Sequence, residues 1–267
     1  MIIKKNYALY ENLNDIQLKI LDHGHAVTDG KWIGNVVSPM YSRIYYIIGG
    51  DPYVVINDHR IDLEIGKCYL FPTGFSFRHA CQSSMEQLYF HINLNDHTGT
   101  DLLRSCQHMM EYIPRPELIQ DMLDKTFSNK VSDNLKLRQA LYGSILAMTD
   151  KYNISLSTAH YSRCVLLAME YIKKHLSLKL TVGELAVNSF VSESTLSKRF
   201  RSEVGITLGS YIDENIFFEA EQLLLKTDLT VLQISERFGF CDQFYFSRRF
   251  KQKYGETPQK YRKLRLI

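Results

Sequence analysis

The segment Asp242–Tyr261, DQFYFSRRFKQKYGETPQKY, repeats the pattern of Ser192–Tyr211, SESTLSKRFRSEVGITLGSY, at a displacement of 50 residues. Each copy begins with a side chain that can accept a hydrogen bond from a free backbone N–H of a first helical turn. Two apolar residues four positions apart then form a narrow stripe on one side of a helix. A glycine follows, and it tolerates the positive φ at which many helices end. Each copy therefore predicts one short helix, with these matched positions: Ser192 and Asp242, Leu196 and Phe246, Phe200 and Phe250, Gly205 and Gly255.

Another short amphipathic helix is predicted before each copy, at 182–189 and 231–238. Small residues on their inward sides, Ala186 and Ser235, allow a second helix to cross closely. A helix, a tight turn and a capped second helix make a helix-turn-helix unit. A single copy would be weak evidence, because ordinary helical hairpins give a similar stripe. Two copies in register, each with a basic second helix, predict two such units at about 182–205 and 231–255.

The chain has 267 residues and a net charge of +3, but this charge is unevenly distributed. Residues 1–163 contain 16 Lys and Arg against 17 Asp and Glu, whereas residues 164–267 contain 16 against 12. Between Arg237 and Arg265 there are nine basic residues and two acidic ones. A basic C-terminal end favours a partner that carries phosphates. Charge alone would suit a solvated surface equally well.

Residues 164–267 resemble the DNA-binding domain of the AraC/XylS family of bacterial transcription regulators. The most specific part of the resemblance is Gly239-Phe240-Cys241-Asp242-Gln243-x-Tyr245-Phe246-Ser247-Arg248-x-Phe250-Lys251-x3-Gly255-x-Thr257-Pro258-x2-Tyr261-Arg262. Three positions depart from the family pattern: Cys241 and Ser235 replace a usual Ser and Ala, and Ile216 stands where Arg is common. The resemblance implies a sequence-specific regulator, an activator of transcription, with double-stranded DNA and RNA polymerase as partners.

A helix from about Thr207 to Leu225 is predicted to join the two units. A rigid connector of this kind would place the two recognition helices about one DNA turn apart, roughly 34 Å. Arg248 suits guanine, Gln243 suits adenine, and Phe244 suits the methyl group of thymine. Aligned family positions support base contacts by Ser194, Ser197, Lys198, Gln243, Phe244, Ser247 and Arg248. Phosphate contacts are predicted for Arg199, Arg201, Arg249, Lys251 and Lys253.

The two units are not expected to contribute equally. The second contains Gln243, Arg248 and most of the basic charge, while the first offers Lys198 and two serines. We therefore expect the second unit to supply much of the affinity.

Short apolar or alternating runs between about Trp32 and Asn95 predict β-structure, separated by turn signals at 49–52, 57–58, 66–67 and 72–74. Short, evenly spaced strands indicate a small barrel or jelly roll. The stretch Ile61-x-Leu63-x2-Gly66-x5-Pro72-x-Gly74 resembles the cupin-type effector domain that precedes this DNA-binding domain in many family members. The predicted fold is α+β, with a cupin-like barrel and packed helices in 1–155 and an all-α domain of two helix-turn-helix units in 156–267.

Metal catalysis would require clustered His and carboxylate ligands on facing strands. The early strand Tyr41–Tyr46 has no histidine, and Phe77 occupies the position of a later cupin ligand. His79 and His91 stand alone in the sequence. We therefore predict no metal, no cofactor and no enzymatic activity.

A barrel without metal could still hold a small molecule between its walls. Aromatic faces with a few polar groups suit a sugar or related metabolite, and the family resemblance implies the same ligand class. Each candidate residue would serve equally well as ordinary core. The effector-binding candidates are Trp32, Arg43, Tyr45, Phe71, His79, Tyr89 and His91.

Helices are predicted after the barrel at 101–112, 116–127 and 132–152. The last has an apolar stripe through Leu135, Leu141, Ile145 and Met148. It would cover the barrel or, as the resemblance implies, pair two chains in a homodimer.

The absence of an eighteen-residue apolar run predicts no membrane segment, and the polar N-terminus does not resemble a signal peptide. Five widely spaced cysteines suit a reducing cytoplasm rather than a disulfide framework. Two alternatives remain open at this point. One is a cupin enzyme fused to a DNA-targeting domain, and the other is an architectural DNA-binding protein that senses nothing.

Overall fold

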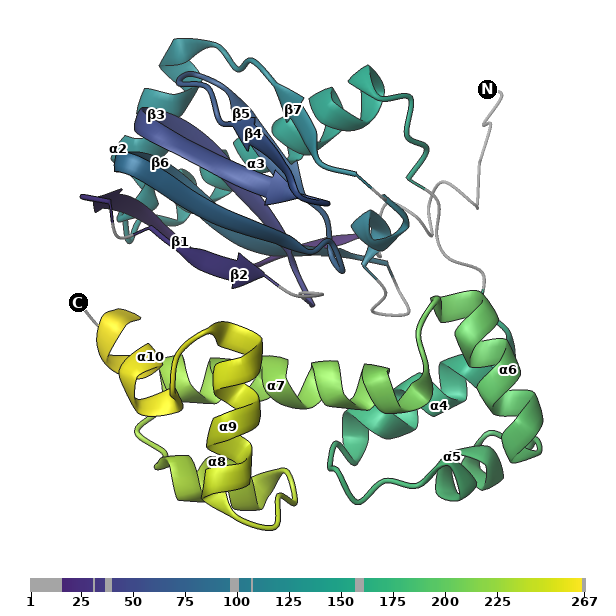
Figure 1. Cartoon of the computed structure of the whole chain (residues 1–267). Coiled ribbons are helices and arrows are strands. Elements are labelled where there is room, and N and C mark those ends of the chain that lie inside the picture. The colour runs from purple at the N-terminus through teal and green to yellow at the C-terminus, as the bar shows by residue number, and fades with distance from the viewer. Residues whose placement is uncertain are drawn as a thin grey trace, which may run out of the picture. The chain divides into compact units, whose positions relative to one another are not determined.

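The computed structural model describes residues 16–30, 32–36, 40–96, 101–106, 108–156 and 161–265. The chain divides into two compact units, Met1–Ala159 and His160–Ile267. The first is rich in antiparallel strands and the second is helical (Figure 1). The predicted α+β class is therefore confirmed.

One antiparallel sheet forms the centre of the N-terminal unit. Its strands follow the order β1 (Gln17–Thr28), β6 (Phe77–Asn95), β3 (Ser42–Ile56), β5 (Cys68–Phe71) and β7 (Met110–Tyr112). Two short strands lie beside this path: β2 (Gly34–Val36) pairs with β6, and β4 (His59–Asp62) pairs with β3. Within the described residues no pairing joins the edges β1 and β7, so the strands of the predicted cupin-like barrel form a sheet that is not closed.

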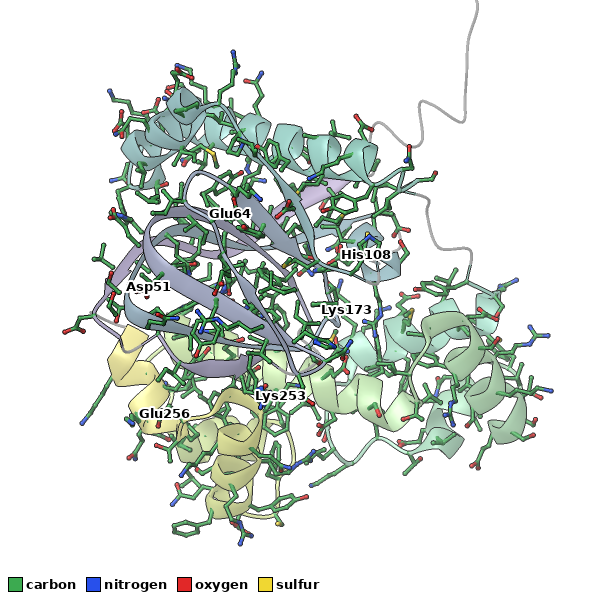
Figure 2. All side chains as sticks on the ribbon, turned by 45° about the horizontal axis from the view of Figure 1, so that its top comes forward. Asp51, Glu64, His108, Lys173, Lys253 and Glu256 are labelled. Atoms are coloured by element: carbon green, nitrogen blue, oxygen red, sulfur yellow. The ribbon has the colours of Figure 1, made fainter. Side chains whose placement is uncertain are left out.

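The predicted turn at 49–52 is wrong, because β3 runs through it with two shifts of register against β6. Gly50 has φ +87°, and a Cβ there would lie 2.3 Å from the carbonyl oxygen of Ser84. The Asp51 carboxylate (labelled in Figure 2) accepts hydrogen bonds from the N–H of Gln82 at 2.7 Å and from the hydroxyl of Ser83 at 2.6 Å. Glycine and aspartate therefore build a bulge that bends two long strands together.

The hydrogen bonds to Asp51, led by that of the Ser83 hydroxyl, lower the pKa of this carboxyl to about 2. A lowered pKa means that the folded state favours the ionised form. The contribution of Asp51 to stability is therefore present at neutral pH, and it is lost as the pH falls from about 4 toward 2.

Three helical segments follow the long strands: the 3-10 turn η1 (Leu102–Ser105), α2 (Pro116–Thr126) and α3 (Val131–Lys151). The predicted helix at 101–112 is wrong, because η1 ends at Ser105 and Met110 then pairs with Leu70 as part of β7. The predictions at 116–127 and 132–152 are confirmed to within a residue or two at each end.

Helix α3 is fastened to one face of the sheet by apolar packing and by buried hydroxyl groups. Leu141, Ile145 and Met148 belong to the same core as the strand residues Ile44 and Phe90. The hydroxyl of Ser144 lies 2.6 Å from that of Tyr46 and 2.7 Å from that of Tyr112. Burial raises the pKa of Tyr46 well above its ordinary value. Because these hydroxyls satisfy each other, α3 has one preferred position on the sheet.

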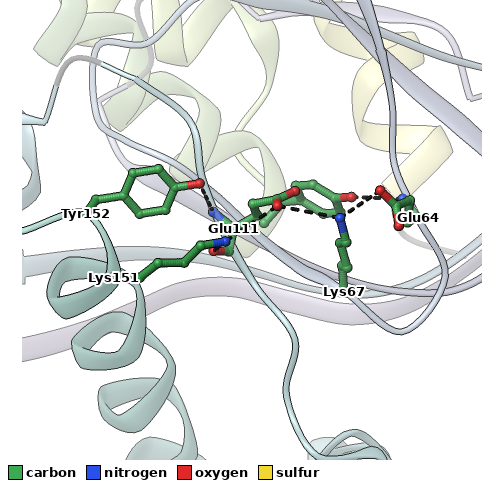
Figure 3. A network of polar contacts seen from close by, with 6 residues as sticks. Glu64, Lys67, Glu111, Lys151 and Tyr152 are labelled. Carbon is green, nitrogen blue, oxygen red and sulfur yellow. Dashed lines mark hydrogen bonds and ion pairs between the residues drawn. The ribbon is translucent and has the colours of Figure 1, made fainter.

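A surface network holds the end of α3 to β7 (Figure 3). Lys67 Nζ lies 2.7 Å from Glu64 Oε1 and 3.5 Å from Glu111 Oε1, and Lys151 Nζ lies 3.5 Å from the same Glu111 oxygen. The hydroxyl of Tyr152 accepts the N–H of Glu111 at 3.3 Å. Exposed pairs of this kind contribute little individually, so the packing beneath them holds the two elements together.

Helices follow one another throughout the C-terminal unit. They are α4 (Arg163–Lys174), α5 (Val182–Asn188), α6 (Glu193–Val204), α7 (Leu208–Lys226), α8 (Val231–Arg237), α9 (Gln243–Tyr254) and α10 (Pro258–Arg265). All of them contribute to one apolar core, and α10 does so through Tyr261. Ile216, at the position where the family commonly has Arg, is fully buried in this core. Within the described residues, no helix is long and apolar enough to span a bilayer.

Replacing Gly50 by Ala should destabilise the N-terminal unit by more than about 2 kcal/mol. The backbone at this position would be strained for a residue with a side chain, and the new Cβ would clash with the carbonyl oxygen of Ser84. Gly66→Ala is the matched control, since Gly66 has φ +83° but no atom within 4 Å of a new Cβ. Trp32 is the chain's single tryptophan, so its fluorescence during urea unfolding reports this unit. Equal losses in the two variants would contradict a steric role for Gly50.

Candidate nucleic-acid interface

The two recognition helices α6 and α9 are built in the same way. Ser192 Oγ accepts the N–H of Thr195 at 3.3 Å, and Asp242 Oδ1 accepts the N–H of Tyr245 at 2.7 Å. The helices end at Gly205 and Gly255, with φ of +84° and +83°. The predicted stripes, Leu196 with Phe200 and Phe246 with Phe250, are fully buried. Burial of one stripe leaves the opposite side of each helix for a partner.

The preceding helices α5 and α8 are also matched. Each begins with a capping box, Thr181 with Glu184 and Thr230 with Gln233, which satisfies two free N–H groups. The small residues Ala186 and Ser235 are buried, and the hydroxyl of Ser235 donates to the Leu232 carbonyl of its own helix at 2.8 Å. Two helix-turn-helix units are therefore present, as the sequence predicts.

The turns of the two units differ. Gly239 has φ +76° in the second unit, whereas the first has Phe190 at φ +57° with 84% of its surface exposed. The apolar ring of Phe190 thus lies in solvent at a backbone position that favours glycine.

All nine predicted DNA-binding residues of the two helices lie outside the apolar core. On α6, Ser194, Ser197, Lys198 and Arg201 are exposed. On α9, Phe244, Arg248 and Lys251 are exposed, while Gln243 and Ser247 are half-buried. The fold places these side chains on helix faces that a duplex could reach. Their contact with DNA stays a prediction.

Two of the basic residues predicted to contact phosphates, Arg249 and Lys253, face the connecting helix α7 instead. Arg249 Nη2 lies 2.8 Å from Asp213 Oδ1 on α7. Lys253 is largely buried, and this burial lowers its pKa. Both lie against the connecting helix α7, because positions 249 and 253 follow the buried side of α9 rather than its outer side. Sequence reasoning could not separate them from Arg248 and Lys251, since all four are basic.

The seven effector-binding candidates come together on the face of the sheet opposite α3. Strand register aligns His91, Arg43 and Phe71 in one row and Tyr89 with Tyr45 in the next. Trp32 joins them from outside the strands, with its ring centroid 4.3 Å from that of His79 and 6.1 Å from that of Tyr45.

Burial separates these candidates into two groups. Phe71 and Tyr45 are buried in the apolar core of this face, and Phe71 stacks on Phe77 at 4.2 Å. Arg43 is buried too and donates to the hydroxyl of Tyr41 at 3.1 Å. His91 is also buried, with Nδ1 3.4 Å from Asp22 Oδ2. The half-buried candidates are Trp32, His79 and Tyr89.

Two glycines that the sequence did not single out shape this face. A Cβ at Gly34 would lie 2.5 Å from His79 Nε2, and one at Gly24 would lie 3.0 Å from Tyr89 Cε1. The rings of His79 and Tyr89 therefore lie directly over neighbouring strands. This role of the two glycines follows from the pairing of β1 and β2 with β6, which the sequence alone does not show. Among the described residues, no group of three His, Cys, Asp or Glu could hold a metal ion.

Comparison with known proteins places this architecture among regulators. A helix-turn-helix domain family matches residues 185–264. The Msm operon regulatory protein of Streptococcus mutans is 24% identical over 268 residues, which cover 94% of this chain and 95% of that protein. The xylose operon regulatory protein of Escherichia coli is 36% identical over 98 residues, which cover 37% of this chain and 25% of that protein.

A solved structure resembles the whole chain. ToxT from Vibrio cholerae, in a crystal structure with bound unsaturated fatty acid, aligns with a TM-score of 0.66 over 94% of this chain and 96% of its own, at 14% identity. This likeness shows that the two proteins share a fold.

Replacing Arg248 by Ala should cost about 1–3 kcal/mol at one preferred base pair and relax the specificity there. Lys198→Ala should cost less, because the first unit has few groups that can read bases. Binding to duplexes selected by the wild-type protein from a random pool, and to single-base variants of them, measures both effects. Lys173→Ala removes one exposed charge from α4 and serves as the control. Weakening by Arg248→Ala that is uniform over all sequences would assign this residue to a phosphate, and equal losses from Lys198 and Arg248 would contradict the unequal division.

Proposed function

We propose that this chain is an effector-responsive activator of transcription in the AraC/XylS family, on the premise that a helix-turn-helix domain family matches its residues 185–264. Its relatives are transcription regulators, and two of them are named for operons. The observation that carries the proposal is the pair of capped recognition helices, each with its apolar stripe buried and its polar side outward.

We assign base contacts to Ser194, Ser197, Lys198, Gln243, Phe244, Ser247 and Arg248, and phosphate contacts to Arg201 and Lys251. The second helix-turn-helix unit has more side chains that can distinguish bases than the first, which supports a division in which the second unit reads more of the DNA sequence. RNA polymerase is the expected partner of the bound regulator. Transcription in vitro from a selected site, with and without the protein, would reveal activation or repression.

The N-terminal unit is proposed to hold the effector against the face that contains Trp32, His79 and Tyr89. Aromatic rings beside an imidazole suit a sugar, whose C–H faces stack on rings while its hydroxyls accept and donate hydrogen bonds. The name of the xylose operon regulator agrees with this ligand class, although that match covers 98 residues only. The fatty acid bound by ToxT supports a second class of ligand, because the ToxT alignment covers both units. An effector acts only if it binds two states of the chain unequally.

A homodimer formed by α3 is part of the proposal. One exposed line along this helix contains Lys136, Gly143, Leu146 and Asp150, with Leu135 beside it. Leu135 and Leu146 are 62% and 54% exposed. Lys136 precedes Gly143 by seven residues and Asp150 follows it by seven. Antiparallel pairing around Gly143 would therefore set Lys136 against Asp150 of a second copy, and it would do so twice because a two-fold interface repeats every contact.

The effector proposal predicts that a sugar raises the melting temperature of the N-terminal unit and changes the affinity for a selected duplex. At one hundred times its dissociation constant, a ligand stabilises the folded state by about 2.7 kcal/mol. Trp32 fluorescence measures the shift for a panel of pentoses, hexoses and disaccharides, with oleate beside them. His79→Ala should weaken binding, whereas His59→Ala, on the exposed strand β4, should not. A response to oleate alone would show that the ligand is a fatty acid rather than a sugar. No response to any compound would refute effector sensing.

The dimer proposal predicts that Lys136→Glu and Asp150→Lys each weaken self-association, while an equimolar mixture of the two variants associates again. The reason is that each heterodimer regains oppositely charged neighbours. Sedimentation velocity measures the molecular mass in each case. Val187→Glu is the control, since Val187 is 74% exposed but lies on α5. A wild-type chain that remains monomeric at all concentrations would contradict the proposal.

A further inference from the structure

An ion pair joins the second recognition helix, α9, to α7, the helix that connects the two helix-turn-helix units. Arg249 of α9 pairs with Asp213 of α7 at 2.8 Å, and its guanidinium lies 5.2 Å from the centroid of the Phe217 ring. One turn further along α9, Lys253 Nζ lies 5.7 Å from the same ring. Figure 2 shows Lys253 on α9 beside α7. The two cations thus lie near the same aromatic residue of the connecting helix.

Two further carboxylates of α7 near these cations are removed from water. Glu214 and Glu221 of α7 are buried, and the hydroxyl of Tyr261 on α10 donates to Glu221. The burial of Lys253 lowers its pKa, while Glu214, Asp213 and Glu221 act in the opposite direction. The Arg249 and Asp213 side chains are 30% and 27% exposed, so their ion pair is partly removed from water, and it favours one geometry because its energy depends on close approach.

The internal repeat supplies a comparison within the same molecule. At a displacement of 50 residues, Arg249 corresponds to Arg199 and Lys253 corresponds to Glu203. Arg199 Nη1 lies 3.9 Å from Cys164 Sγ, and Glu203 accepts the N–H of Ser162 at 2.7 Å. The same two positions therefore hold α6 to the start of α4 in the first unit and α9 to α7 in the second. Only in the second unit is the contact an ion pair between helices.

The position of this contact matters because α7 packs on both helix-turn-helix units. Its first turns pack on the first unit, where the Tyr211 and Phe200 rings are 5.2 Å apart. The second unit is held by the hydroxyl of Tyr254, which donates to the Phe217 carbonyl at 2.9 Å, as well as by the ion pair. The angle of α9 on α7 then determines where the outward residues Arg248 and Lys251 lie relative to the first recognition helix.

We propose that Arg249 and Lys253 are positioning residues that bind α7 rather than DNA, and that the ion pair of Arg249 with Asp213, together with Lys253 beside the Phe217 ring, sets the spacing of half-sites that the protein accepts. The proposal rests on the proposed function, since it assumes that both units meet one duplex. It assigns the basic residues of α9 to two tasks. Arg248 and Lys251 bind the nucleic acid, while Arg249 and Lys253 orient the helix that presents them.

The test uses the full-length chain and a duplex that the wild-type protein selects from a random pool. Affinity is measured over a range of salt concentrations, and again on duplexes in which the half-sites are moved one or two base pairs apart. Lys251→Gln should lower the magnitude of the salt slope by about one, because one phosphate contact is lost. Arg249→Gln and Lys253→Met should leave the slope unchanged. They should also reduce the wild-type preference for the selected spacing, about tenfold or more, to roughly threefold or less.

Restoration of the contact provides the second arm of the test. Arg249→Lys, and the exchange of charges in Asp213→Arg with Arg249→Asp, should recover much of the spacing preference. Circular dichroism follows the folding of each variant. A slope that falls in Arg249→Gln as it does in Lys251→Gln would make Arg249 a phosphate contact and overturn the inference. Uniform weakening on every spacing would overturn it as well, by showing a structural role only. If the wild-type chain enriches no sequence at all, the proposed function fails instead.

Discussion

The burial of two apolar side chains, one helical turn apart, on each recognition helix is the constraint on which the C-terminal unit depends. Leu196 with Phe200, and Phe246 with Phe250, leave no choice about which side of the helix faces the core. Each large side chain contributes about 1.5–3 kcal/mol by leaving water, which exceeds the contribution of any single surface contact. The residues on the opposite side are then presented to a partner without needing any interaction of their own.

The connecting helix α7 joins the two helix-turn-helix units, so that their recognition helices keep a fixed relation to each other. It meets α9 through the apolar residue Phe217 and through the acidic residue Asp213, and these two kinds of contact have different consequences. Apolar packing tolerates small changes of angle, because dispersion contacts are numerous and individually weak. A partly buried ion pair has a narrower optimum, since its favourable energy depends on close geometry. Asp213 and Arg249 therefore restrict an orientation that Phe217 and Phe250 would leave more open.

In the N-terminal unit the two faces of one sheet have separate roles. One face is covered by α3 and fixed by the hydroxyls of Tyr46, Ser144 and Tyr112. The other gathers the aromatic residues, and its half-buried side chains are those of Trp32, just before β2, and of His79 and Tyr89 of β6. Gly24 and Gly34 permit this, because only an absent Cβ lets the rings of Tyr89 and His79 lie over the neighbouring strand. Whatever binds there would meet a rigid wall.

The recognition helices and the class of partner could be predicted from the sequence, because caps, apolar stripes and terminal glycines act within one or two helical turns and recur 50 residues apart. Two long strands could not, since Gly49 to Pro52 resembles a turn locally and becomes a bulge only when Asp51 meets Gln82 and Ser83 across the sheet. The same limit applies to the basic residues of α9. Their identity determined that this helix is cationic, but the tertiary structure alone decided that Arg249 and Lys253 face α7, because the carboxylates that attract them lie on another helix about thirty to forty residues earlier in the chain.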